Sequence, residues 1–136
     1  MNFQEFLNKG KSVKGITKKI VVGDRFKDEN GKDFYFTIKT LSADKIEQFR
    51  TKAGSYDNNG NFKFDSMLFN TKIAIEGCEY PNFKDAKSIR ERNCNTPEQY
   101  IKDVLLPGEI EALGESIKRL SGYNIPINEL IEEAKN

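Results

Sequence analysis

Residues 20–40, IVVGDRFKDENGKDFYFTIKT, decide the fold of this chain. Residues 20–26 and 33–40 are rich in β-branched and aromatic side chains, which favour strands. Between them, residues 28–31 (DENG) are typical of a turn, and Asn-Gly tolerates the positive φ angles of a type I′ turn. The stretch therefore predicts a β-hairpin.

The second predicted strand alternates in character, as a strand with one buried face does. Phe34, Phe36 and Ile38 point one way, whereas Tyr35, Thr37 and Lys39 point the other way. We expect the first set to face the core and the second set to face water.

Helix signals dominate the chain beyond this hairpin. Ser42 is a helix N-cap, and Leu41 and Ile46 are spaced as a hydrophobic staple. Ile46, Phe49 and Ala53 then form an apolar stripe at helical spacing.

The next segment, residues 54–61, is rich in turn-forming residues and predicts a loop. It is not a calcium loop of the EF-hand type, because Phe62 stands where that loop requires Gly.

Residues 65–77 fit a strand by their alternation and a helix by their length. The helix is favoured, because Asp65 is a good N-cap and no Gly or Pro interrupts the segment before Gly77.

Three further helices are predicted towards the C-terminus, after a break at Tyr80-Pro81 and a short helix over residues 85–92. One starts at Thr96-Pro97, a capping box with Pro at N1. Its buried side consists of Tyr100, Ile101, Val104 and Leu105. The second starts at Pro107 and carries the stripe Ile110, Leu113, Ile117 and Leu120, with Gly122 as its left-handed C-cap. The third starts at Pro126 and carries Ile127, Leu130, Ile131 and Ala134.

The first 19 residues predict a short helix and a basic arm. Asn2 caps a helix that places Phe3, Phe6 and Leu7 on one side, and a Lys-rich connector follows it. The arm contains no Arg and no aromatic residue, so the bidentate readout and base stacking of specific nucleic-acid binding are absent from it.

Together these signals predict an α+β fold. An N-terminal β-hairpin or small antiparallel sheet packs against a predominantly helical C-terminal two-thirds. Three segments are expected: the helix and arm (1–19), one α+β domain (20–123) and a C-terminal amphipathic helix (124–136). One domain is also the expectation for 136 residues.

The composition argues against most enzyme classes. The chain has no His, which removes the commonest general base, every Ser-His or Cys-His pair and the usual nitrogen ligand of zinc. Its two cysteines, Cys78 and Cys94, are too few for a disulfide scaffold or a structural zinc site, so free thiols are expected. We expect no catalytic residues, no metal and no cofactor. No apolar run is long enough to cross a membrane.

Charge is unevenly distributed. Residues 1–20 carry five lysines and one glutamate, whereas residues 98–136 carry four basic and eight acidic side chains. Two solvated faces explain this asymmetry, and head-to-tail self-association between protomers is the alternative.

Four ordered motifs resemble the XkdN-like tail assembly chaperones of contractile-tailed phages and phage-derived particles. They are YPNFKD at 80–85, TPE at 96–98, LLPGE at 105–109 and LSGY at 120–123. Within them, Pro81, Asn82, Pro107, Gly108, Glu109 and Gly122 are expected to be architectural, setting turns and helix starts.

The resemblance implies a non-enzymatic chaperone. It would bind and solubilise the phage tape measure protein in the cytoplasm of the bacterial host and be absent from the mature particle. The alternatives are a structural tail or baseplate component and a small nucleic-acid-binding regulator that uses the Lys-rich arm.

The two terminal stripes are the candidate contact surface for that partner. They consist of Phe3, Phe6 and Leu7 at one end and Ile127, Leu130 and Ile131 at the other. The alternative is that both helices pack on the core of the domain.

Overall fold

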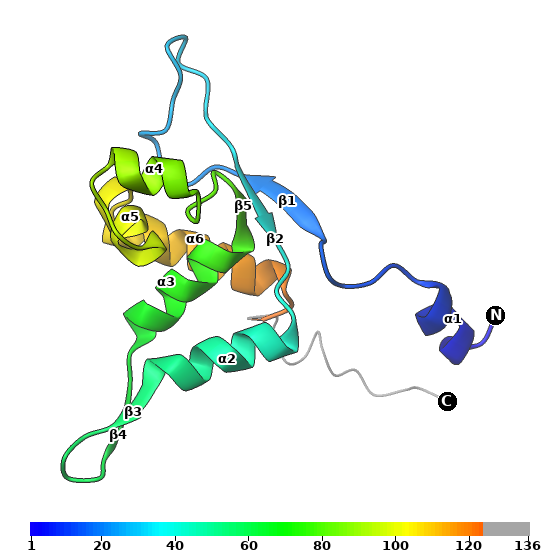
Figure 1. Ribbon diagram of the computed structural model, residues 1–136. Helices are drawn as coiled ribbons and strands as arrows, with labels where there is room; N and C mark the ends of the chain where they lie inside the picture. Colours follow the sequence, from blue (N-terminus) through cyan, green and yellow to red (C-terminus); the bar gives the residue numbers. More distant parts are fainter. Residues whose placement is uncertain (124–136) are drawn as a thin grey trace.

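The computed structural model describes residues 1–123 (Figure 1). The helices are α1 (Phe3–Lys9), α2 (Ala43–Ala53), α3 (Ser66–Gly77), α4 (Ala86–Glu91), α5 (Pro97–Val104) and α6 (Pro107–Leu120). The strands are β1 (Thr17–Ile20), β2 (Phe36–Lys39), β3 (Gly54–Tyr56), β4 (Phe62–Phe64) and β5 (Cys78–Tyr80).

An antiparallel sheet with the order β1-β2-β5 forms one side of the body, and helices α2 and α3 lie between β2 and β5 in the chain (Figure 1). The predicted α+β class is therefore confirmed. The predicted strand bounds are wrong, because pairing starts at Thr17 and β1 ends at Ile20. Residues 21–35 instead leave the sheet as a long excursion.

The turn of this excursion is not type I′ as predicted. Gly31 has a φ of +81°, whereas Asn30 is not in the left-handed region. The Asp28 carboxylate accepts the N–H groups of Asn30 (2.8 Å) and Lys32 (3.0 Å), so it stabilises a turn in which only the glycine needs a positive φ.

Strand β2 buries Phe36 and Ile38, at 3% and 1% exposure, as the alternation predicts. The prediction for Phe34 is wrong, because its side chain is 56% exposed. Phe34 lies before the paired part of β2, within the excursion. Its backbone N–H donates to the Phe26 carbonyl of the same excursion at 2.8 Å.

Helices α3 and α6 pack against each other at the centre of the core. Their approach is close at Gly77, where a Cβ atom would lie 2.5 Å from Cγ2 of Ile117. The stripe of α6 is buried at Ile110, Leu113 and Ile117, and that of α2 at Ile46, Phe49 and Ala53, as predicted.

The predicted starts of α2, α3 and α5 are confirmed. Ser42, Asp65 and Thr96 each accept a backbone N–H at the start of α2, α3 and α5. Segment 65–77 is thus the predicted helix. Gly122 has a φ of +97°, as its predicted left-handed conformation requires.

The prediction of a simple loop over residues 54–61 is wrong. Strands β3 and β4 pair there as a second hairpin, in register from Gly54↔Phe64 to Tyr56↔Phe62. It projects from the body at the junction of α2 and α3 (Figure 1). The predicted helix starting at Pro126 lies outside the described residues.

Candidate partner-binding surface

Helix α1 carries the first candidate contact surface. Asn2 caps it by accepting the Glu5 N–H at 2.8 Å, as its sequence predicts. Phe3, Phe6 and Leu7 come together on one side, with the two phenyl rings stacked at a centroid distance of 6.4 Å. All three remain exposed, by 75%, 61% and 56%.

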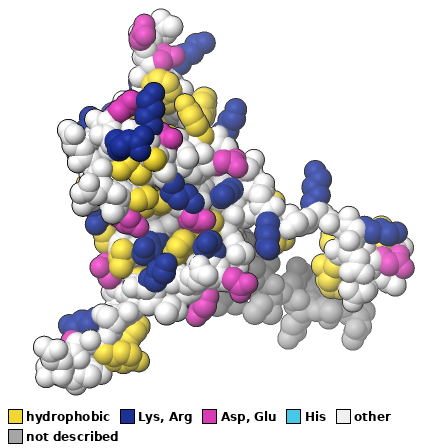
Figure 2. Space-filling model, viewed as in Figure 1, with side chains coloured by type: hydrophobic (Ala, Val, Ile, Leu, Met, Phe, Trp, Pro, Cys, Tyr) yellow, Lys and Arg dark blue, Asp and Glu magenta, His cyan; other side chains and the backbone are white. Residues whose placement is uncertain are grey.

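In the structure this helix does not pack on the core. None of the residues of α1 is buried. The helix stands apart from the body at the end of the basic connector (Figure 1), and its yellow side chains are visible on the separate lobe in Figure 2. Thr40 anchors the connector by donating its hydroxyl to the carbonyl of Val13. An apolar helix face is thus held away from the core that could have covered it.

The second candidate stripe, Ile127, Leu130 and Ile131, lies outside the residues that the structure describes.

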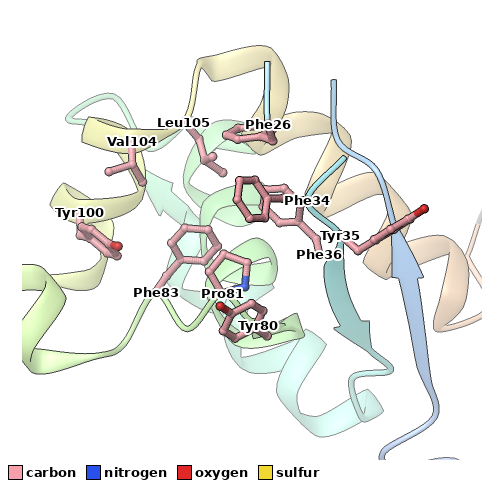
Figure 3. Close-up of a pocket in the computed structure, with 10 residues that line it drawn as sticks. All are labelled: Phe26, Phe34, Tyr35, Phe36, Tyr80, Pro81, Phe83, Tyr100, Val104 and Leu105. Atoms are coloured by element: carbon pink, nitrogen blue, oxygen red, sulfur yellow. The ribbon is translucent and has the colours of Figure 1, made fainter. Parts of the chain in front are cut away.

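An aromatic groove forms a further apolar surface that the sequence reasoning missed. Its volume is about 270 Å³. The lining residues are Phe26, Phe34, Tyr35, Phe36, Tyr80, Pro81, Phe83, Tyr100, Val104 and Leu105. Figure 3 shows Phe34, Phe36, Phe83 and Tyr80 around Pro81, whereas Tyr35 points away from them.

Three separate parts of the chain build this aromatic groove: the excursion with the start of β2, the segment that ends β5, and α5. Phe26 meets Phe36 edge-on at 5.2 Å, and Phe83 meets Tyr100 at 5.9 Å between ring centroids. Phe83 is only 1% exposed and forms its floor, whereas Tyr80 is 69% exposed at its rim. The clustering of aromatic residues at 34–36 and 80–83 was the available signal, but sequence alone does not show that the two clusters meet.

Glu109 connects this groove to the start of α6. Its carboxylate accepts hydrogen bonds from Nε and Nη2 of Arg25, at 2.8 and 2.7 Å. It also accepts the backbone N–H of Leu106 at 2.7 Å. Arg25 also donates to the Val104 carbonyl at 2.7 Å, and its guanidinium lies 4.4 Å from the centre of the Phe26 ring. This Arg25–Glu109 pair ties the excursion to the junction of α5 and α6.

The electrostatics of Glu109 follow from that contact. The hydrogen bonds from Arg25 are the largest influence and lower the pKa of Glu109, against the opposing effect of partial burial. Its side chain is 12% exposed. A charged carboxylate is therefore the stable form in the folded chain.

The other motif residues lie at element boundaries. Pro81 follows a cis peptide bond after β5, and the Asn82 side chain accepts the Lys84 N–H at 3.0 Å. Pro107 is the first residue of α6, and a Cβ atom on Gly108 would have no neighbour within 4 Å. Gly122 adopts its positive φ just after α6.

The β3–β4 hairpin exposes a third group of apolar side chains. Tyr56, Phe62 and Phe64 are 75%, 60% and 43% exposed, and the Tyr56 and Phe62 rings meet at 5.4 Å. Hydrophobic side chains are visible in yellow on this hairpin at the lower left of Figure 2. The Asp57 carboxylate accepts the N–H groups of Asn59 and Asn61, both at 2.9 Å, so it stabilises the turn rather than binding a cation.

Two kinds of reactive site, a nucleophilic cysteine and a metal site, find little support in residues 1–123. Cys78 is buried and its thiol donates to the Pro81 carbonyl at 3.3 Å. Burial raises its pKa to about 12, so the nucleophilic thiolate is scarce at neutral pH. Within this range no three or more Cys, Asp or Glu side chains are grouped to hold a metal ion.

None of the helices in the described part of the chain is both long and apolar enough to span a membrane.

Comparison with known proteins places the chain in a family. Residues 3–135 match the model of the phage XkdN-like tail assembly chaperone proteins. The chain is 30% identical to the phage-like element PBSX protein XkdN of Bacillus subtilis strain 168, over 96% of this chain and 92% of that protein. It is also 30% identical to the uncharacterized protein YqbN of the same strain, over 96% and 91% of the two chains.

A solved structure supports the fold. The crystal structure of the protein YqbN superposes with a TM-score of 0.68 at 22% sequence identity, covering 88% of this chain and 95% of that one. The motifs, the match over almost the whole sequence and the shared fold agree, and the chain belongs to the family of phage XkdN-like tail assembly chaperones.

Proposed function

We propose that this chain is a non-enzymatic chaperone that binds the tape measure protein and keeps it soluble during tail assembly. It acts in the cytoplasm of the bacterial host and is absent from the mature particle. Membership of the tail assembly chaperone family supports this role. The observation that carries the binding part is α1, whose three apolar side chains are each more than half exposed.

Helix α1 has the properties of a docking element. A helix of seven residues is too short to be stable alone in water, and nothing in the body covers its apolar side. Packing Phe3, Phe6 and Leu7 against an apolar stripe of a partner helix removes these side chains from water and stabilises α1 at the same time. We propose that these three residues contact the tape measure protein.

The aromatic groove supplies a second surface on the body. Its rim residues Phe34 and Tyr80 are more than half exposed, while its floor is fixed by the core. Aromatic side chains contribute large apolar areas to interfaces, and such exposed groups favour a partner over a purely architectural role.

The test is co-expression with a candidate tape measure protein from the same phage element, comparing soluble yield and co-purification with the candidate alone. We expect the wild-type chain to raise the soluble yield and to co-elute. Phe3→Ser, Phe6→Ser and Leu7→Ser combined should weaken binding at least about tenfold, since burying each such side chain contributes about 1.5–3 kcal/mol. The thermal midpoint should shift by less than about 2 °C, because surface changes rarely affect stability.

Gln4→Ser with Asn8→Ser is the matched control. These two side chains bond to each other at 3.3 Å on α1 and belong to its polar side. The control should bind as the wild type does. Unchanged tape measure solubility, together with recovery of this chain in sedimented tails, would contradict the proposal and indicate a structural component. Retention on nucleic acid that falls steeply with salt would indicate the regulator instead.

A further inference from the structure

The inner face of β1 is left open along one edge. Residues directly opposite each other in an antiparallel pair share a face, so Lys18 lies on the same side as Ile38, and Ile20 on the same side as Phe36. Ile38 and Phe36 are buried, which defines this as the core side of the sheet. Lys18 is nevertheless exposed. Within residues 1–123, the helical layer that covers β2 therefore does not extend over β1.

A crevice marks this gap, between β1 and the last turns of α6. Its volume is about 280 Å³. The β1 side provides Lys18 and Ile20, with Ile38 behind them, and the α6 side provides Ser116, Arg119 and Leu120 along with Glu115. Ile20 and Leu120 are only partly buried, although both border the core. The crevice thus combines apolar lining residues with charged ones.

Two cations of this crevice, Lys18 and Arg119, form no salt bridge within the described part of the chain. Glu115 is paired with Lys118 at 2.6 Å. An occupant with an apolar stripe flanked by carboxylates would match both features.

The chain itself contains such a segment next to the crevice. Tyr123, the last residue that the structure describes, lies three positions after Leu120, and residues 124–136 follow it in the sequence. At helical spacing they carry the stripe Ile127, Leu130 and Ile131, with Glu132 and Glu133 flanking it on opposite sides. Ten residues of helix from Pro126 would be about 15 Å long, close to the roughly 13 Å of a four-residue strand.

We propose that residues 124–136 fold back in the same molecule as an amphipathic helix that fills this crevice. Ile127, Leu130 and Ile131 cover Ile20 and Leu120, and the flanking glutamates pair with Lys18 and Arg119. The segment then completes the layer under β1. This assigns the C-terminal stripe to the chain's own sheet and leaves α1 as the terminal surface for the partner.

Proximity in the full-length chain is the first test. Ile20→Cys with Leu130→Cys, in a Cys94→Ser background, should form a disulfide on mild oxidation and run as a monomer on non-reducing gels. Cys78 can stay, because it is buried. Asn58→Cys with Leu130→Cys is the matched control, since Asn58 lies at the tip of the distant β3–β4 hairpin, and it should not cross-link within the chain. A cross-linked dimer from the first pair would assign the crevice to a second copy and overturn the proposal.

Thermal stability is the second test. It distinguishes a C-terminal stripe that packs on the chain's own sheet from one that binds the partner. Leu130→Ser with Ile131→Ser should lower the thermal midpoint of the full chain by about 5–10 °C, whereas Phe3→Ser with Leu7→Ser should leave it unchanged. An unchanged midpoint for the C-terminal variant, with reduced tape measure binding, would overturn the proposal and assign the stripe to the partner.

Charge exchange is the third test. Lys18→Glu with Arg119→Glu, and separately Glu132→Lys with Glu133→Lys, should each lower the midpoint by a few degrees. The fourfold variant should recover at least half of the loss, and the recovery should shrink in high salt. Additive losses in the fourfold variant would show that the two sets of charges do not meet.

Discussion

Glu109 shows how one side chain fixes the relation between distant segments. Arg25 and Glu109 are 84 positions apart, and the carboxylate holds two nitrogen atoms of the guanidinium and the first turn of α6 at once. Sequence reasoning assigned Glu109 to the helix start, where a carboxylate favours the macrodipole. The contact with Arg25 depends on the excursion returning to α6, which no local pattern encodes.

Loss of this carboxylate should be visible in the pH dependence of stability. Glu109→Gln should lower the free energy of unfolding at neutral pH by about 1.5 kcal/mol, the lower end of the typical range for hydrogen bonds to a charged group, because Arg25 is half exposed. Because the folded pKa lies below the ordinary value of 4.5, the stabilisation is complete above about pH 5. It is lost as pH falls through the folded pKa. Urea denaturation from pH 7 to pH 3 should therefore show the two proteins converging in acid, and a constant difference would contradict this role.

Gly77 provides a second test at the residue scale, through packing. A Cβ atom there would lie 2.5, 2.8 and 3.0 Å from three side-chain carbons of Ile117, which is fully buried and has little room to move. Gly77→Ala should cost about 1–3 kcal/mol. Gly108→Ala is the matched control, because its Cβ would meet nothing within 4 Å and alanine favours a helix, so stability should stay equal or rise by up to about 1 kcal/mol. Equal losses in both variants, measured in urea, would contradict the packing argument.

At the scale of elements, local signals and tertiary contacts contribute differently. The starts of α2, α3 and α5 follow from Ser42, Asp65 and Thr96, because an N-cap acts on the three residues after it. The β3–β4 hairpin was missed, because its strands are three residues long and no apolar alternation of useful length exists. Its register depends on pairing rather than on propensity.

The exposed β3–β4 hairpin should be dispensable for folding. Replacing residues 55–63 by Asn-Gly leaves Gly54 opposite Phe64 across a two-residue turn, and shortens a loop without uncovering the core. The free energy of unfolding should change by less than about 1 kcal/mol in urea denaturation. Phe69→Ala is the comparison, since Phe69 is 8% exposed and its loss should cost about 3 kcal/mol or more. A loss of similar size in the shortened chain would place the hairpin in the core.

At the scale of the whole molecule, the distribution of apolar surface is the main finding. One core cluster joins the sheet to the helices from Val22 to Ile117. Outside it, within residues 1–123, large apolar side chains gather on α1, at the rim of the aromatic groove and on the β3–β4 hairpin. Three exposed apolar groups on one small domain fit a protein that completes its packing with partners.

The sequence by itself determined the α+β class, the helices of residues 1–123 with their caps and apolar stripes, the family and the apolar face of α1. These follow from the order of neighbouring residues, since caps, stripes and turns act over three or four positions. Only the tertiary structure decided which apolar residues stay uncovered. Phe34 alternates as a buried residue does and is exposed, and Tyr80 and Phe83, three positions apart, become the rim and the floor of one groove. Exposure depends on which distant segment reaches a side chain, and that is a property of the assembled core rather than of any stretch of sequence.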